Sequence, residues 1–208
     1  MPAPYTVFLM GGIASGKSAA ARRMEALGAS RIDLDAISHE LLGPGMPLLD
    51  EIASEFGDDL IDSETGELNR GLLADRAFAS AESAARLEAI EHPAIIARLG
   101  DILLECGCAA SIPEACVVEV PLPDRMGEAL SLADELIAVT CPRELRRARA
   151  IGRGMTGDDF DARDALQPDE GYLLGIAHTV FDNSGSAESL IAQVDAWWDL
   201  RFSKDRLL

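Results

Sequence analysis

Residues 8–20 read FLMGGIASGKSAA, and this stretch decides the fold. Its apolar beginning predicts the end of a β-strand, and its alanine-rich end predicts the start of a helix. Between them, residues 11–18 satisfy the pattern G-x-x-x-x-G-K-[ST]. A glycine-rich turn between a strand and a helix lets main-chain N–H groups and the helix N-terminus surround a phosphate group. The stretch therefore predicts a phosphate-binding loop.

Two side chains of this loop have candidate roles in binding ATP. We expect Lys17 to reach the β- and γ-phosphates and Ser18 to offer its hydroxyl to Mg²⁺. The small residues around them let backbone amides approach phosphate oxygens. The expected ATP-binding residues of this segment are Gly12, Ile13, Ala14, Ser15, Gly16, Lys17, Ser18 and Ala19.

Two other nucleotide-binding classes fit the sequence less well. A dinucleotide-binding G-x-G-x-x-G ending at Gly16 would need glycine at position 13, which is Ile13, although Asp33 lies where the ribose-binding acid would fall. A GTPase would explain the D-x-x-G of residues 124–127, but no N-K-x-D occurs in the chain. We interpret Asp124 as an aspartate at the start of a helix.

The composition is that of a globular protein, 48% hydrophobic and 26% charged over 208 residues. Its 36 acidic and 18 basic side chains give a formal charge of −18, which disfavours nucleic acid and anionic membranes as partners. No apolar run approaches the roughly 20 residues of a membrane span, and no basic-then-apolar leader precedes the first expected strand. We therefore expect a cytoplasmic protein, with the oligomeric state open and a monomer as the working expectation.

The cysteines indicate reduced thiols in or near a core. Cys106, Cys108, Cys116 and Cys141 lack paired C-x-x-C spacing, and nothing in the sequence indicates secretion. A metal cluster of the first three is a less favoured alternative.

Five short apolar runs alternate with helical patterns along the chain. This alternation predicts an α/β fold, a P-loop NTPase-type doubly wound parallel sheet of about five strands. The expected strands are residues 5–10, 30–34, 115–120, 135–140 and 178–181.

Two segments are too long for simple crossovers and predict additions to this core. Residues 35–107 carry a helical pattern and predict a helical subdomain. Residues 143–174 predict a lid, built from an arginine-rich helix, a polar turn at 152–159 and another helix. The nucleotide-binding core is then expected in residues 1–34, 108–142 and 175–208.

The stretch RIDLDA, residues 31–36, offers carboxylates for phosphoryl transfer to an alcohol. Such a reaction needs a carboxylate near the accepting hydroxyl. Alternation along the second strand would point Asp33 and Asp35 to the same side, at the sheet edge beside the phosphate loop. Asp35 has the alternative role of capping the next helix.

With these motifs the chain resembles the dephospho-CoA kinases, which phosphorylate the ribose 3′-hydroxyl of dephospho-CoA in the last step of coenzyme A synthesis. The resemblance runs nearly end to end and rests on GGIASGKS, RIDLDAISHELLGPGMPLLDEIASEFGDDLID, GELNRGLLADRAFAS, LEAIEHPAI, VVEVPL, Gln167 and FDNSGSAESLIAQV. It implies that Asp33 is the general base and that the helical insertion is the acceptor domain.

The resemblance also implies substrate-binding positions. His92, before Pro93, would lie in the substrate groove, with packing or capping as its ordinary alternative. Pro121 and Leu122 are further candidates, or they only shape the turn after the third strand. Here the chain departs from the family, because Pro-Leu-Pro-Asp-Arg at residues 121–125 stands where the family usually has Pro-Leu-Leu-Phe-Glu.

The expected lid carries the densest basic cluster of the chain. Arg149 and Arg153, four residues apart, are expected on one helix face, where a guanidinium suits phosphate oxygens and adenine stacking. We assign a catalytic role to Arg153 and ATP binding to both. The alternative is a solvated face paired with carboxylates such as Glu144. The remaining cluster members, without assigned roles, are Arg143, Arg146 and Arg147.

The leading hypothesis is an ATP- and Mg²⁺-dependent kinase acting on dephospho-CoA, with small molecules as its partners. Lys17, Asp33 and Arg153 are its expected catalytic residues. Two alternatives stay open: a related P-loop kinase that phosphorylates another nucleoside or small alcohol, and a nucleotide-binding protein that has lost transfer.

Overall fold

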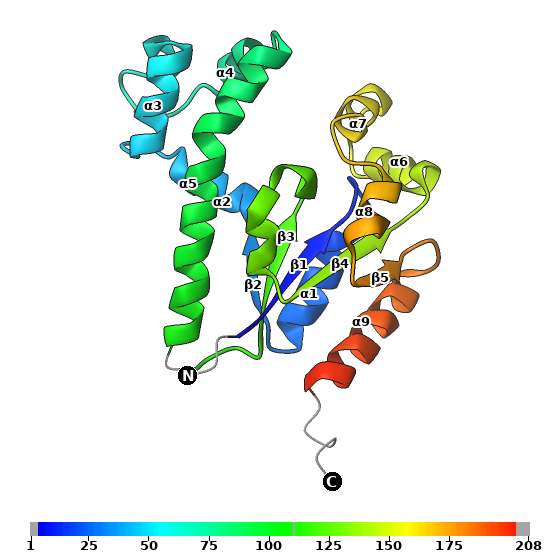
Figure 1. Ribbon diagram of the computed structural model, residues 1–208. Coiled ribbons are helices and arrows are strands. Elements are labelled where there is room, and N and C mark those ends of the chain that lie inside the picture. Colours follow the sequence, from blue (N-terminus) through cyan, green and yellow to red (C-terminus); the bar gives the residue numbers. More distant parts are fainter. Residues whose placement is uncertain (1–3, 110, 203–208) are drawn as a thin grey trace. The chain divides into compact units, whose positions relative to one another are not determined.

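Five strands form one parallel sheet (Figure 1). The structure, a computed structural model, describes residues 4–109 and 111–202. The strand order is β2-β3-β1-β4-β5, and every neighbouring pair is parallel, which confirms the predicted fold class. The strands are β1 (Tyr5–Met10), β2 (Ser30–Asp33), β3 (Ala115–Val120), β4 (Glu135–Thr140) and β5 (Thr179–Asp182).

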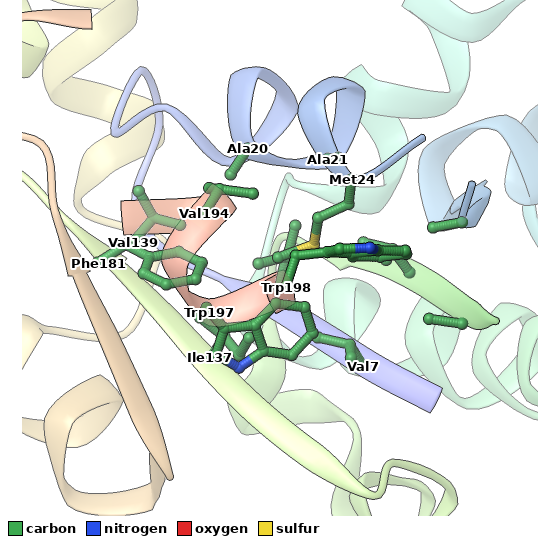
Figure 2. Packing of buried hydrophobic residues seen from close by; sticks show 14 of the residues in the cluster. Val7, Ala20, Ala21, Met24, Ile137, Val139, Phe181, Val194, Trp197 and Trp198 are labelled. Carbon is green, nitrogen blue, oxygen red and sulfur yellow. The ribbon is translucent and has the colours of Figure 1, made fainter. Parts of the chain in front are cut away.

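One face of the sheet is covered by α1 (Lys17–Ala26) and α9 (Ala187–Phe202). Alternate residues of β1, such as Val7 and Leu9, point to this face and are fully buried. Figure 2 shows Met24 of α1 beside Trp198 of α9, with Trp197 nearby. The small alanines of α1 bring that helix close to the sheet, while the α9 tryptophans fill the remaining volume.

The opposite face of the sheet is also buried. Phe8, Met10 and Val118 alternate with the residues of the first face and are likewise inaccessible to solvent. Burial on both faces explains why β1 and β3 are almost continuously apolar. The single charged residue of β3, Glu119, is therefore an exception that needs a reason.

The chain divides into two compact units. The described residues up to Asp33 and from Leu103 onward form the unit that contains the sheet. Residues 34–102 form a helical unit with its own core, which includes Ile52, Leu60 and Leu73. Its helices are α2 (Leu34–Leu41), α3 (Pro47–Phe56), α4 (Arg70–Ala77) and the larger part of α5 (Ala81–Cys108), with a short 3₁₀ turn, η1 (Asp58–Leu60).

The segment expected as a lid contains three helices, α6 (Arg143–Gly152), α7 (Gly157–Asp164) and α8 (Glu170–Ile176). The prediction of a single helix after the polar turn is therefore wrong. Pro168 cannot donate a backbone hydrogen bond, and Asp169 caps α8 by accepting from the Tyr172 N–H at 2.7 Å, so a new helix begins there.

Two short 3₁₀ turns, η2 (Pro123–Arg125) and η3 (Gly127–Leu132), follow β3. Asp124 lies in the first turn of η2, in agreement with its interpretation as a helix-start residue. All four cysteines are free, although Cys108 is exposed and so lies outside any core. Across residues 4–109 and 111–202, no three His, Cys, Asp or Glu side chains group as metal ligands, and no helix is long and apolar enough to cross a membrane.

Candidate active site

The predicted phosphate loop joins β1 to α1 and has an unusual backbone. Ala14 has φ 59° and Gly16 has φ 114°, both in the left-handed region. A Cβ atom at Gly16 would collide with the side-chain amide of Asn183, so this position requires glycine. For Ala14 the conformation is costly, and such strain concentrates at ligand-binding sites.

Lys17 is the first residue of α1, and its side chain turns back over the loop. Its ammonium donates hydrogen bonds to the carbonyl oxygens of Gly11 at 2.5 Å and Gly12 at 3.2 Å. The positive charge therefore lies at the loop itself, beside the helix N-terminus, where an anion is favoured. Ala19 packs against the core, and its N–H donates to the Gly16 carbonyl at 2.9 Å.

Asn183, which follows β5, is hydrogen-bonded to the phosphate loop. Its Nδ2 donates to the Ser15 carbonyl at 2.6 Å, and its own N–H donates to the Thr140 carbonyl at 2.8 Å. Arg149 donates to the Asn183 carbonyl at 3.0 Å, so this arginine braces the segment after β5. Asn183 had no expected role, although the motif FDNSG contains it.

The segment expected as a lid contacts the loop at Ile13. The Ile13 N–H donates to Oε1 of Gln167 at 2.6 Å, and Arg146 Nη1 lies 3.4 Å from the Ile13 carbonyl oxygen. Arg146 is held by Asp164 at 2.5 Å. Sequence reasoning gave Arg146 no role, because five clustered arginines offer no internal signal of which one faces the loop.

Arg153 lines a cavity of about 360 Å³ next to the loop. Ile13, Ala14 and Arg163 line the same cavity, so the structure brings the expected lid arginine and the loop together. The expectation that Arg149 and Arg153 share a helix face is wrong, since α6 ends at Gly152. Only Arg153 of the two lines this cavity.

The carboxyl ends of β2 and β3 bring two acidic residues to the same level as the end of β1. Asp33 pairs in register with Glu119, and Glu119 pairs with Leu9. Neighbouring strands are about 4.8 Å apart, and paired residues point to the same face. This face is the one that α1 covers, so both carboxylates lie on the side of the phosphate loop and helix.

Glu119 links the loop to β2. It is only 5% exposed, and its Oε2 accepts the Ser18 hydroxyl at 2.6 Å. Its Oε1 accepts from Arg31 Nε at 2.7 Å and lies 2.5 Å from Nη2 of the same guanidinium. Burial alone would lower the pKa of Arg31, but the attraction of Glu119, followed by Asp33, outweighs it and raises that pKa. The signal that could have found Glu119 is a lone charge in an otherwise apolar strand.

The other expected substrate residues lie elsewhere. Asp35 is in the first turn of α2, because β2 ends at Asp33, so the expectation of two aspartates alternating along one strand is wrong. His92 lies inside α5 of the helical unit, and its Nε2 is buried without a hydrogen-bond partner. Pro121 and Leu122 directly follow β3 and are partly buried.

The donor atoms around the loop fit a magnesium ion. The Ser18 hydroxyl and the carboxylates of Glu119 and Asp33 are hard oxygen donors on one face of the sheet edge. Mg²⁺ is typically bound in proteins by one or two carboxylates together with substrate phosphates. A strained backbone cradle with a lysine ammonium likewise fits a polyphosphate.

Comparison with known proteins identifies the family of this chain. Residues 5–189 match the family model for dephospho-CoA kinase. A dephospho-CoA kinase of Corynebacterium jeikeium is 40% identical over 194 residues, which cover 93% of this chain and 97% of that protein. A solved dephospho-CoA kinase from Campylobacter jejuni has a TM-score of 0.64 at 25% identity, covering 95% of this chain and 97% of its own.

A crystal structure of a Thermus thermophilus protein superimposes with a TM-score of 0.79 at 25% identity, over 97% of this chain and all of the other. The family match extends over the sheet, the phosphate loop and the helical unit alike. By its sequence from β1 into α9, this chain belongs to the dephospho-CoA kinase family.

Proposed function

We propose that this protein transfers the γ-phosphoryl group of ATP to the ribose 3′-hydroxyl of dephospho-CoA, giving coenzyme A. Family membership supports the reaction. The observation that carries the proposal is the register of Asp33, Glu119 and Leu9, which aligns two carboxylates with the strand that opens into the phosphate loop. Phosphoryl transfer needs such an arrangement of phosphate cradle and nearby carboxylate.

The phosphate loop would hold ATP. The loop from Gly12 to Ser18 would place backbone N–H groups around the phosphates once the Ile13 N–H leaves Gln167. Lys17 supplies a charge that can move from the loop carbonyls to the β- and γ-phosphates. Ser18 is the residue that would hold Mg²⁺, and Glu119 lies behind its hydroxyl. When bound, that ion would supply positive charge that neutralises the phosphates.

Asp33 is the proposed general base. It ends β2 at the sheet edge where ligands of doubly wound folds bind, one strand away from the residue that contacts Ser18. A carboxylate there can accept the proton of the attacking hydroxyl as that oxygen approaches the γ-phosphorus. Asn in its place would keep the shape and lose the proton acceptor.

Arg153 is proposed to neutralise charge that develops on the transferred group. Its place on the cavity shared with Ile13 and Ala14 supports this role. Arg149 is proposed to act indirectly, because its bond to the Asn183 carbonyl supports the residue that holds Ser15. Residues 143–174 would then work as a lid over the nucleotide.

The helical unit is proposed as the acceptor domain, with Asp35 and His92 among the residues that meet dephospho-CoA, together with Pro121 and Leu122 after β3. The unpartnered buried Nε2 of His92 supports a role beyond packing. We propose the cytoplasm as the site of the reaction, since all four cysteines are free thiols, as expected in a reducing compartment.

Mass spectrometry tests this function directly. The protein is incubated with ATP, Mg²⁺ and dephospho-CoA, and we expect one added phosphoryl group on the acceptor, which a 3′-specific phosphatase removes. The Asp33→Asn variant is the control and should form little product. A panel of other nucleosides and small alcohols runs in parallel. Transfer to one of those alone, or ATP binding without any transfer, would contradict the proposal.

A further inference from the structure

Arg31 occupies a distinctive position beside the proposed metal site. It precedes Asp33 by two residues on β2, so both side chains leave the strand on the same face. Its Nε donates to Oε1 of Glu119 at 2.7 Å, and its Nη2 lies 2.5 Å from the same oxygen in an ion pair. The Glu119 side chain is 7% exposed, so this is a largely desolvated pair.

The second oxygen of Glu119 is thereby directed at Ser18. The Ser18 hydroxyl donates to Oε2 at 2.6 Å. A serine hydroxyl has one proton and two lone pairs, and it binds a metal through a lone pair. Because the proton is committed to Glu119, the lone pairs point away from that carboxylate. The hydroxyl is therefore oriented before any metal arrives.

Arg31 also offsets repulsion between acids. Asp33 and Glu119 are register partners on neighbouring strands, about 4.8 Å apart along the sheet, and their like charges oppose each other. The guanidinium bonds to one carboxylate and attracts the other. Without it, the Glu119 side chain would lose both its charge partner and its fixed orientation.

We propose that Arg31 is a positioning residue, which acts through Glu119 to orient the Ser18 hydroxyl for the metal that accompanies the nucleotide. This inference rests on the proposed kinase function. Residues that orient metal ligands from behind typically change metal affinity by about 10–100-fold when they are removed. Removing Arg31 should therefore lower the affinity for the nucleotide when Mg²⁺ is present and leave the affinity without Mg²⁺ unchanged.

Isothermal titration calorimetry with a non-hydrolysable ATP analogue separates these contributions. Each protein is titrated once with Mg²⁺ and once with EDTA. For Arg31→Met we expect unchanged affinity for the analogue in EDTA. The increase in affinity that Mg²⁺ gives should be smaller by about 10-fold or more. Arg31→Lys should restore part of the gain, because it keeps the charge and loses the planar fork. Arg22→Met, on the exposed side of α1, is the matched control and should behave as wild type.

Circular dichroism establishes that each variant is folded at the titration temperature. If Arg31→Met does not fold, Arg31→Lys and Glu119→Gln decide the question, since both keep the side-chain size and should lower the same gain. A full Mg²⁺ gain in the folded variants would overturn the inference, and so would an equal loss with Mg²⁺ and with EDTA. A wild-type protein that binds the analogue no better with Mg²⁺ would contradict the proposed function itself.

Discussion

Glu119 and Glu135 are both buried glutamates on strands that flank β1, at opposite ends of the sheet. Each accepts from an arginine and from a hydroxyl: Glu119 from Arg31 and Ser18, Glu135 from Arg201 and Thr179. Glu135 also accepts from the Trp197 indole at 3.1 Å and from the Tyr5 hydroxyl at 3.1 Å.

The two carboxylates differ in their remaining capacity to accept hydrogen bonds. Glu135 accepts five hydrogen bonds that join β1, β4, β5 and α9, which saturates its oxygens. In the described chain Glu119 accepts from Arg31 Nε and from the Ser18 hydroxyl, and the latter belongs to the phosphate loop. A buried glutamate thus stabilises the fold at the amino end of the sheet, where it is Glu135. At the carboxyl end, where it is Glu119, it organises a site. Variants at the two ends should therefore separate activity from stability.

The largest expected effect is on turnover, at the carboxyl end. Asp33→Asn should lower kcat by about 10²–10⁴-fold if this carboxylate acts as general base, because the amide cannot accept the proton. ATP affinity and the melting temperature should change little. Steady-state kinetics with dephospho-CoA, calorimetric ATP titration and thermal unfolding measure the three quantities. A variant with wild-type turnover would remove Asp33 from the mechanism.

The second effect is on stability, at the amino end. Glu135→Ala leaves the Arg201 guanidinium, the indole N–H and two hydroxyls without their common acceptor, and breaking such a pair costs about 3–5 kcal/mol. For a chain of this size the melting temperature should fall by about 6–20 °C. Below that temperature kcat should stay within about twofold of wild type. A stable variant with impaired turnover would reverse the roles of the two ends.

A third prediction concerns pH. Burial raises the pKa of Glu135, but hydrogen bonds from Thr179, Trp197 and Arg201 and the Arg201 charge outweigh it, so the pKa lies below its usual value. The folded protein therefore binds this proton less readily than the unfolded chain. The stabilisation is complete above the unfolded pKa of about 4.3, and it is lost as pH falls through the folded pKa.

Urea unfolding of wild type and Glu135→Gln at several pH values between 6 and 3 measures this contribution. The difference in unfolding free energy should be largest near pH 6 and shrink as the solution is acidified. Asp59→Asn in the helical unit is the control, because the Asp59–Arg76 pair is exposed and contributes little. A difference that stays constant over this pH range would show that the Glu135 charge is not what stabilises the amino end.

The sequence predicted the carboxyl end of the sheet better than the amino end. The phosphate loop can be recognised in the sequence because its chemistry needs adjacent residues in a fixed pattern. The Glu135 network joins residues from Tyr5 to Arg201, more than 190 positions apart, and its members are ordinary strand and helix residues. Only the three-dimensional register brings them together.

Strand ends and helix caps account for most of the remaining differences between the predicted and the observed elements. β1, β3 and β4 have the predicted bounds, since apolar runs end there at polar or turn residues. The second strand ends one residue earlier than predicted, at Asp33, and α2 begins at Leu34, so Asp35 lies in a helix and does not continue the alternation of the strand. A strand boundary carries no strong local signal when a helix follows without a turn.

The smallest effects give the closest comparison, because Ser18→Ala and Thr179→Val each remove one hydroxyl that donates to a buried glutamate. Thr179→Val should cost about 1–2 kcal/mol of unfolding free energy and leave kcat and the Mg²⁺ requirement unchanged. Ser18→Ala should cost a similar amount or less, and raise the Mg²⁺ concentration for half-maximal turnover by about 10-fold or more. Urea unfolding and Mg²⁺ titrations of initial rate measure both. The two hydrogen bonds have the same chemistry and differ only in their place in the sheet. Equal Mg²⁺ requirements in the two variants would therefore mean that the Ser18 hydroxyl has only a structural role, like the Thr179 hydroxyl.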